Sequence, residues 1–161
     1  EPFGTFIGLY DGNLLQIKNL NIKSASNNCG LFSAINGNVS SDYAHRLKNI
    51  IMTDVYVETD NMNGGGLAAI FTTEWSLEYN VTGIIISNHH DVGGAFGRVS
   101  SLDTFIQNSY GSSIVLNKGV GAGSFIGYHQ DGRRLGKNYS LGLGLGKYRY
   151  GSLVGRSRCT S

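Results

Sequence analysis

The densest group of metal-ligand side chains in the sequence is the run His89, His90 and Asp91. Imidazole and carboxylate groups bind zinc, but a site forms only where the side chains converge on one point. Neighbouring residues of a strand point to opposite faces, so His89 and His90 would make a poor chelating pair there. An exposed turn before Gly93 accounts for the same residues equally well. We therefore expect no metal site and no cofactor.

Carboxylates could instead support glycoside hydrolysis, which needs two of them about 5–10 Å apart. The acidic residues are scattered along the chain. If successive turns of the chain stack as parallel strands, equivalent positions lie about 4.8 Å apart, and Asp60 and Asp91 could come together. The alternative is that both are solubilising loop charges. No histidine is tied by spacing to a particular serine, so we expect no catalytic residue and keep a carbohydrate-active enzyme as an alternative.

Five asparagines recur at nearly constant spacing, 30, 31, 28 and 30 positions apart. They are Asn19, Asn49, Asn80, Asn108 and Asn138. Self-similarity at a period of about 20–50 residues is typical of repeat architectures. Asparagine amides at a recurrent turn can stack on the copies above and below and satisfy buried backbone groups. We predict a structural asparagine ladder, the alternatives being a line of ligand contacts and, at Asn80 and Asn138, glycosylation.

Blocks of small residues recur with the same period. They span 29–33, 65–69, 93–97, 123–127 and 151–155, and a sixth copy spans 4–8. Their central residues are predicted to stack in the interior: Leu31, Leu67, Ala95, Phe125 and Leu153. The apolar, β-branched runs between the blocks predict strands at 20–22, 50–57, 84–86 and 114–116. Only residues 42–51 hint at a helix, and an extended turn fits them as well.

Short strands in units of 28–31 residues favour an all-β fold, a parallel β-helix (β-solenoid) of about five coils. A propeller blade needs about 40 residues and four strands. We expect a single domain over 1–161, with an opening partial coil at 1–16, five repeats at 17–155 and a tail at 156–161.

The blocks at 93–97 and 151–155, GGAFG and GSLVG, resemble the GLUG motif. The opening Phe3-Gly-Thr-Phe, followed by Tyr10-Asp-Gly-Asn, looks like the first coil of GLUG-containing right-handed β-helices. Such helices occur in bacterial cell-surface adhesins, autotransporter-like proteins and the non-catalytic N-terminal regions of IgA-specific metallopeptidases. The resemblance implies a right-handed β-helix with a structural or adhesive role in a secreted or cell-surface protein.

The chain departs from that pattern in three places. The first block begins with Cys29 instead of Gly, and the second ends in Ala69. The chain has no His-Glu-x-x-His, so the zinc catalytic site of those peptidases is absent. The resemblance therefore implies a scaffold and not an enzyme.

The charge of the chain is unevenly distributed, although the net charge is only +2. Residues 1–117 hold five bases and ten acids, and residues 118–161 hold eight bases and one acid. Two ends of opposite charge indicate end-to-end contact with another copy, or with adjoining repeats of a longer chain; a random excess on a solvated face is the alternative. Neither end shows a helix that would cap open strand edges. We expect no nucleic-acid partner, and no membrane insertion because no apolar run is long enough.

The two cysteines are expected about 20 Å apart, beyond the limit of roughly 7 Å between the Cα atoms of a disulfide. An alternative function is that of a self-assembling extracellular fibre subunit that stacks end to end. A disulfide from Cys159 of one subunit to Cys29 of the next would suit such a head-to-tail fibre, with Arg156 and Arg158 at the same contact. The alternative for Cys29 is a small buried filler. Loops at 40–46, 74–79 and 129–134 are candidate contacts for a host protein or glycan.

Overall fold

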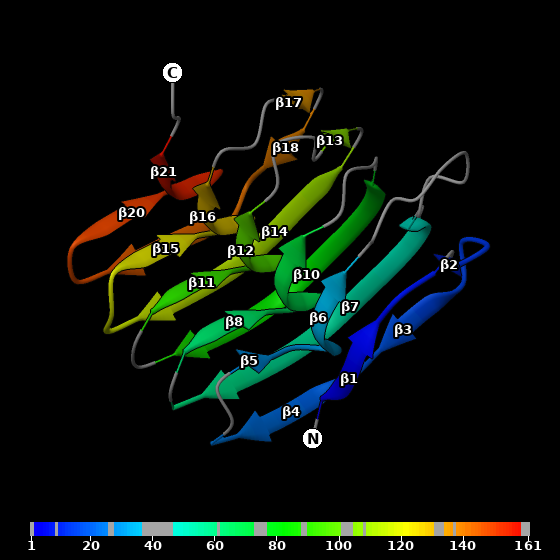
Figure 1. The fold of residues 1–161 in the computed structure, drawn as a ribbon, viewed down its shortest axis with the longest axis horizontal. Coiled ribbons are helices and arrows are strands. Elements are labelled where there is room, and N and C mark those ends of the chain that lie inside the picture. Colours follow the sequence, from blue (N-terminus) through cyan, green and yellow to red (C-terminus); the bar gives the residue numbers. More distant parts are fainter. Residues whose placement is uncertain are drawn as a thin grey trace.

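A computed structural model of the chain describes residues 2–8, 10–25, 28–36, 47–60, 62–72, 77–87, 90–100, 105–107, 109–130, 134–136 and 138–158. This part of the chain is all-β, with 21 strands and no helix. Every strand pair in it is parallel, and the strands form three sheets (Figure 1). The predicted all-β class with parallel strands is confirmed.

Sheet 1 has six strands, in the order β1 (Phe3–Phe6), β6 (Phe32–Asn36), β9 (Ala68–Thr72), β12 (Phe96–Ser100), β16 (Ile126–Gln130) and β21 (Val154–Arg158). Sheet 3 has five, in the order β5 (Asn28–Cys29), β8 (Asn63–Gly65), β11 (Asp91–Gly93), β15 (Gly121–Gly123) and β20 (Arg149–Gly151). In both sheets the spatial order follows the order along the chain.

Sheet 2 has ten strands and contains the longest ones. Its centre is β7 (Leu47–Thr59), β10 (Leu77–Ser87) and β14 (Tyr110–Asn117). On one side, β2 (Tyr10–Asp11), β3 (Gln16–Lys18) and β4 (Asn21–Ser24) pair with β7. On the other, β18 (Tyr139–Ser140) and β19 (Leu143–Gly146) pair with β14. The short strand β13 (Phe105–Gln107) pairs with the start of β10, and β17 (Arg134–Gly136) pairs with β13.

Alternation along the chain explains why these runs form strands. In β14, Ser113, Val115 and Asn117 are buried, whereas Ile114 and Leu116 between them are exposed. Successive side chains of a strand point to opposite faces, so this pattern places one face of the sheet against the interior. The predicted strands at 20–22, 50–57, 84–86 and 114–116 fall in or overlap β4, β7, β10 and β14. Residues 47–51 belong to strand β7, so the hint of a helix was wrong there; residues 42–46 lie outside the described part.

The core lies between the three sheets. It contains Met52, Val55 and Val57 from sheet 2, with Phe71 and Phe96 from sheet 1 stacked 4.7 Å apart between ring centroids. The central residues of the small-residue blocks pack here as predicted: Leu31, Leu67, Ala95 and Phe125 are buried, and Leu153 packs against them. Backbone hydrogen bonds link neighbouring blocks, from Leu67 to Ala95 and from Ala95 to Phe125. The alternation of large and small residues fills the space between layers.

One block is out of register with the others. Phe3 pairs with Phe32 and Thr5 with Ala34, so Gly4 lies beside Ser33. Sequence similarity aligned Gly4 with Cys29 instead. The pairing of β1 with β6 follows their aromatic side chains, and the Phe6 and Phe32 rings lie 5.0 Å apart. The block at 4–8, expected to be a sixth copy, therefore begins within strand β1 and not at the turn that opens the other blocks.

Candidate functional site

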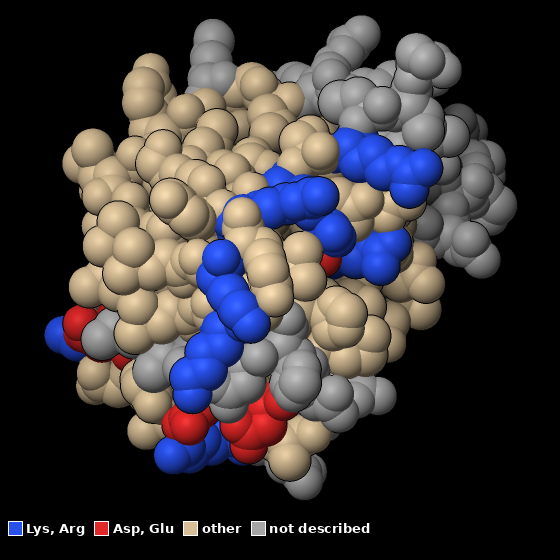
Figure 2. Space-filling model, turned by 90° about the vertical axis from the view of Figure 1, so that its left-hand side faces the viewer, with Lys and Arg blue, Asp and Glu red and all other residues tan. Residues whose placement is uncertain are grey.

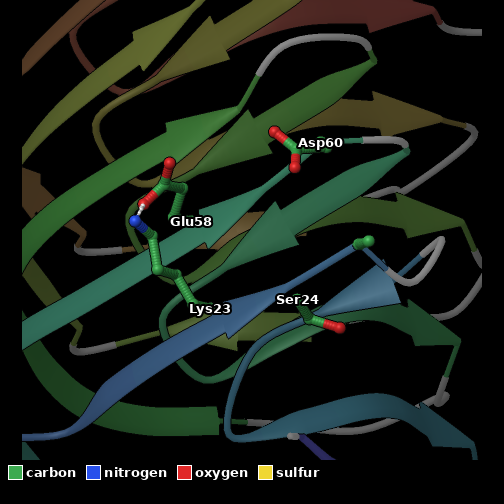
Figure 3. Close-up of a pocket in the computed structure, with 5 residues that line it drawn as sticks. Lys23, Ser24, Glu58 and Asp60 are labelled. Carbon is green, nitrogen blue, oxygen red and sulfur yellow. Dashed lines mark ion pairs between the residues drawn. The ribbon is translucent and has the colours of Figure 1, made fainter.

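A hollow lined by charged side chains lies at the ends of β4 and β7 (Figure 3). Its volume is about 270 Å³, and it is lined by Lys23, Ser24, Ala25, Glu58 and Asp60. Lys23 Nζ lies 2.7 Å from Glu58 Oε2, and the Tyr56 hydroxyl donates to the same oxygen at 3.1 Å. Figure 3 shows Lys23 and Glu58 pointing toward each other, while the Ser24 hydroxyl points away from them.

Lys23 and Glu58 hold each other in their charged forms. The hydrogen bond to Glu58 raises the pKa of Lys23, and the same bond lowers the pKa of Glu58. Hydrogen bonding to Glu58 also raises the pKa of Tyr56. A general acid or base works best with a pKa near the operating pH, and all three shifts lead away from it. The hollow holds an ion pair open to solvent, with the Lys23 side chain 69% exposed.

A second cluster of charged and aromatic side chains lies on sheet 1. Arg98, Tyr128 and Arg156 occupy paired positions on β12, β16 and β21. The Tyr128 ring is buried between the two guanidinium groups, with Arg156 Cζ 3.6 Å and Arg98 Cζ 5.5 Å from its centroid. Both distances are within cation–π range. Arg98 also donates a hydrogen bond to the side-chain oxygen of Gln130.

Asp91 on β11 completes this cluster. Its Oδ2 accepts a hydrogen bond from Arg156 Nη2 at 3.0 Å, and its side chain is only 4% exposed. The residue paired with Asp91 is Gly121, where an added Cβ would lie 2.5 Å from Asp91 Oδ1, so glycine leaves room for the carboxylate. Burial raises the pKa of Asp91 above its usual range, and the positive charge of Arg156 opposes this shift. The cluster ties β11 to β21 and offers no exposed reactive group.

The predicted asparagine ladder is not in register. Asn80 pairs with Ile51 and Tyr110, not with Asn49 or Asn108. On either side of Asn19, Lys18 pairs with Thr53 and Asn21 pairs with Tyr56, so each pairs with the residue 35 positions further along the chain. Asn49 is only 30 positions from Asn19 and is therefore not its partner. The inward-facing apolar residues set this register, and it does not follow the asparagine spacing. Asn108 lies outside the described residues.

The other described asparagines of that series still have structural contacts. Asn138 Nδ2 donates to the Ile106 carbonyl at 2.9 Å, and its Oδ1 accepts from the Ser109 amide at 3.1 Å. Asn49 Nδ2 donates to Asp11 Oδ1 at 2.9 Å. Asn19 and Asn49 have φ angles of 58° and 54°, a conformation that asparagine tolerates better than most residues. Each holds an irregular point of the backbone.

Two asparagines that the spacing did not single out do stack between neighbouring strands. Asn28 and Asn63 are paired residues of β5 and β8, and Asn63 Nδ2 donates to Asn28 Oδ1 at 3.0 Å. Asn117, buried as the last residue of β14, donates from Nδ2 to the carbonyls of His90 and Gly121. An Asn before a glycine-rich block, at 28 and again at 63, was the available signal for the first pair.

The residues expected at an end-to-end contact have different surroundings. Cys29 is fully buried and its thiol lies 3.7 Å from the Glu58 carbonyl, so the predicted intermolecular disulfide would require the structure to open. The alternative of a buried filler is what the structure shows. Arg156 is engaged with Asp91 and Tyr128, and Arg158 is exposed at the end of β21. Cys159 lies outside the described residues.

The carboxylates considered for hydrolysis do not come together. Asp91 occupies the position of Asn63 in sheet 3, because the next residue, Val92, pairs with Gly64. Asp60 instead lines the hollow beside Glu58. His90 is exposed and His89 lies outside the described residues. The described residues contain no group of three potential metal ligands.

Comparison with protein families, curated proteins and solved structures found no match to this chain. In the part that the structure describes, no helix has the length and apolar character to cross a membrane.

Proposed function

We propose that the chain is a non-enzymatic β-solenoid, a structural and adhesive module of a secreted or cell-surface protein. The observation that carries this proposal is the strand order. Sheets 1 and 3 each take their strands in chain order, and β4, β7, β10, β14 and β19 follow the same order in sheet 2. Successive coils that each contribute one strand to every sheet would produce this arrangement.

Recurrent glycines support the same repeat. At four glycines, an added Cβ would lie only 2.0–2.3 Å from the carbonyl oxygen of the residue three positions further along the chain. These glycines are Gly65, Gly93, Gly123 and Gly151. No side chain fits at such a distance from backbone. The chain therefore makes the same close turn between sheets 3 and 1 four times, at intervals of 28 and 30 residues. Two of these turns, at Gly93 and Gly151, fall in the blocks that resemble the GLUG motif.

The described side chains favour a scaffold over an enzyme. The hollow between β4 and β7 holds an ion pair, and in the second cluster Arg156 is paired with the buried Asp91. A surface role is supported by the aromatic and basic residues that follow β19, where Tyr148 and Tyr150 are exposed beside Lys147 and Arg149. Tyrosine and arginine are enriched in surfaces that bind partners.

Insertion of one additional coil tests the solenoid. A second copy of residues 94–123, placed after Gly123, joins equivalent positions of the repeat. In a solenoid the extra coil lengthens the molecule by about 5 Å in small-angle X-ray scattering and adds to the free energy of unfolding. An insertion of the same 30 residues in shuffled order is the control. Rapid proteolytic removal of both insertions would count against the solenoid.

A binding assay tests the adhesive role: the chain is immobilised and incubated with a panel of polysaccharides and extracellular host proteins. Saturable binding without release of new reducing ends is the expected result. Release of reducing ends would favour the carbohydrate-active enzyme that the sequence left as an alternative. Failure to bind any member of the panel would count against adhesion and leave a purely structural role.

A further inference from the structure

All three sheets end in strands with a partner on one side only among the described residues. We call β1, β4 and β5 the first edge, and β19, β20 and β21 the last edge. The first-edge strands pair with β6, β7 and β8, and the last-edge strands with β14, β15 and β16. Figure 1 shows the two edges on opposite sides of the molecule. Unpaired strand edges are templates for pairing with another chain.

Exposed apolar side chains concentrate near these edges. Of the thirteen exposed large apolar residues in the described part, ten lie in 3–15 or 139–150. Leu15 and Phe3 are 72% and 67% exposed near the first edge, and Leu141 and Tyr150 are 79% and 66% exposed near the last edge. Clustered apolar exposure of this kind marks an interaction surface.

We propose that copies of this chain join head to tail, with the last edge of one copy pairing in parallel with the first edge of the next. The proposal rests on the β-solenoid proposed above and names its partner as a second copy. Because all strands are parallel, only a last edge against a first edge continues the same pairing in all three sheets. An interface between two different surfaces that does not close on itself builds an open filament.

The register shows which residues would meet. Phe3 and Val154 occupy the same position in the first and last strands of sheet 1, since paired residues connect them through Phe32, Ala68, Phe96 and Ile126. In sheet 3, Tyr150 occupies the position of Cys29. A second copy would therefore place Phe3 beside Val154, and Tyr150 beside the strand that carries Cys29.

Charge selects this arrangement over the pairing of two last edges. Residues 134–158 contain six bases and no acid, so two last edges repel each other. Residues 1–60 contain six acids and four bases, a net charge of −2, which attracts the last edge. On the face shown in Figure 2, the acidic side chains gather mainly toward the lower end and Lys and Arg continue above them. Attraction of this kind weakens as salt is added.

Analytical ultracentrifugation of the full chain over a wide concentration range, with electron microscopy of the same samples, tests the proposal. The mass should grow beyond a dimer with concentration, and the assemblies should shorten at high salt. Phe3→Lys places a positive charge opposite the basic last edge, and Tyr150→Asp places a negative charge opposite the acidic first edge. Each should weaken association at least tenfold. Ile114→Lys, at a 47% exposed position in the middle of sheet 2, is the matched control and should assemble like wild type.

A mixture of the two edge variants identifies the direction of pairing. Phe3→Lys retains an intact last edge and Tyr150→Asp an intact first edge, so the mixture should stop at a heterodimer while each variant alone stays monomeric. A wild-type chain that is monomeric at every concentration, or that stops at a dimer, overturns the proposal, as does loss of assembly in Ile114→Lys. The coil insertion distinguishes failure of the head-to-tail pairing from failure of the proposed solenoid. A chain that stays monomeric but accepts the extra coil is still a solenoid.

Discussion

Arg156 and Asp91 are 65 residues apart in the chain, and Arg156 Nη2 lies 3.0 Å from Asp91 Oδ2. They lie on β21 and β11, strands of different sheets. The guanidinium of Arg156 also lies over the Tyr128 ring, with Cζ 3.6 Å from the ring centroid. A contact between sheets 1 and 3 is thus built from three residues that are far apart in the sequence.

Loss of Arg156 should destabilise the fold because it leaves the Asp91 charge buried without its partner. We expect Arg156→Gln to lower the free energy of unfolding by about 3 kcal/mol in urea at neutral pH. Adding Asp91→Asn to this variant should recover much of the loss, but not the cation–π contribution of about 1 kcal/mol. Arg158→Gln, an exposed change on the same strand, should stay within about 0.5 kcal/mol of wild type. Equal losses in the two arginine variants would contradict the importance of the ion pair.

The stability contributed by Asp91 should fall as pH rises. Burial raises the pKa of Asp91, so the folded chain holds this proton more tightly than the unfolded chain. Stability is therefore lost from about pH 3.9, the usual aspartate pKa, up through the raised value. The difference in unfolding free energy between wild type and Asp91→Asn, measured in urea, should decrease over this window. An increase would mean that the attraction of Arg156 outweighs burial.

Replacing a turn glycine with alanine should destabilise the chain far more than the same change at a glycine with open space around it. Gly123→Ala would place a Cβ 2.0 Å from the Ile126 carbonyl oxygen, a backbone atom that cannot rotate away. We expect a loss of about 3 kcal/mol or more in urea unfolding. At Gly4 nothing lies within 4 Å of an added Cβ, so Gly4→Ala should be neutral to within about 0.5 kcal/mol. Similar midpoints for both variants would rule out the close turn.

Cys29 should resist alkylation in the folded chain. Its side chain is fully buried, and burial raises the pKa of its thiol, so the reactive thiolate is scarce. Mass mapping of the peptide that carries Cys29 after iodoacetamide treatment should show reaction at least about a hundredfold slower than in urea, because reaction requires opening. Equal rates with and without urea would place Cys29 at the surface, and an intermolecular disulfide would again be feasible.

Much of the local structure was predictable from the sequence. The runs at 50–57 and 114–116 form β7 and β14, and the block centres from Leu31 to Phe125 are buried as expected. These features depend on side-chain alternation and on residue size, which are properties of neighbouring residues. The hollow at Lys23 and Glu58 was not predictable, because the two residues are 35 positions apart and neither belongs to a recognisable motif.

The sequence by itself determined that the chain is all-β, where its main strands lie and where glycine must turn it, because alternation and the absence of a Cβ act locally. Only the tertiary structure decided which residues meet. Paired strands are separated by 29, 36, 28, 30 and 28 residues along sheet 1, so an even spacing such as that of Asn49 and Asn80 does not carry the register. Burial of apolar faces sets that register, and it brings Asn63 onto Asn28 and Arg156 onto Asp91.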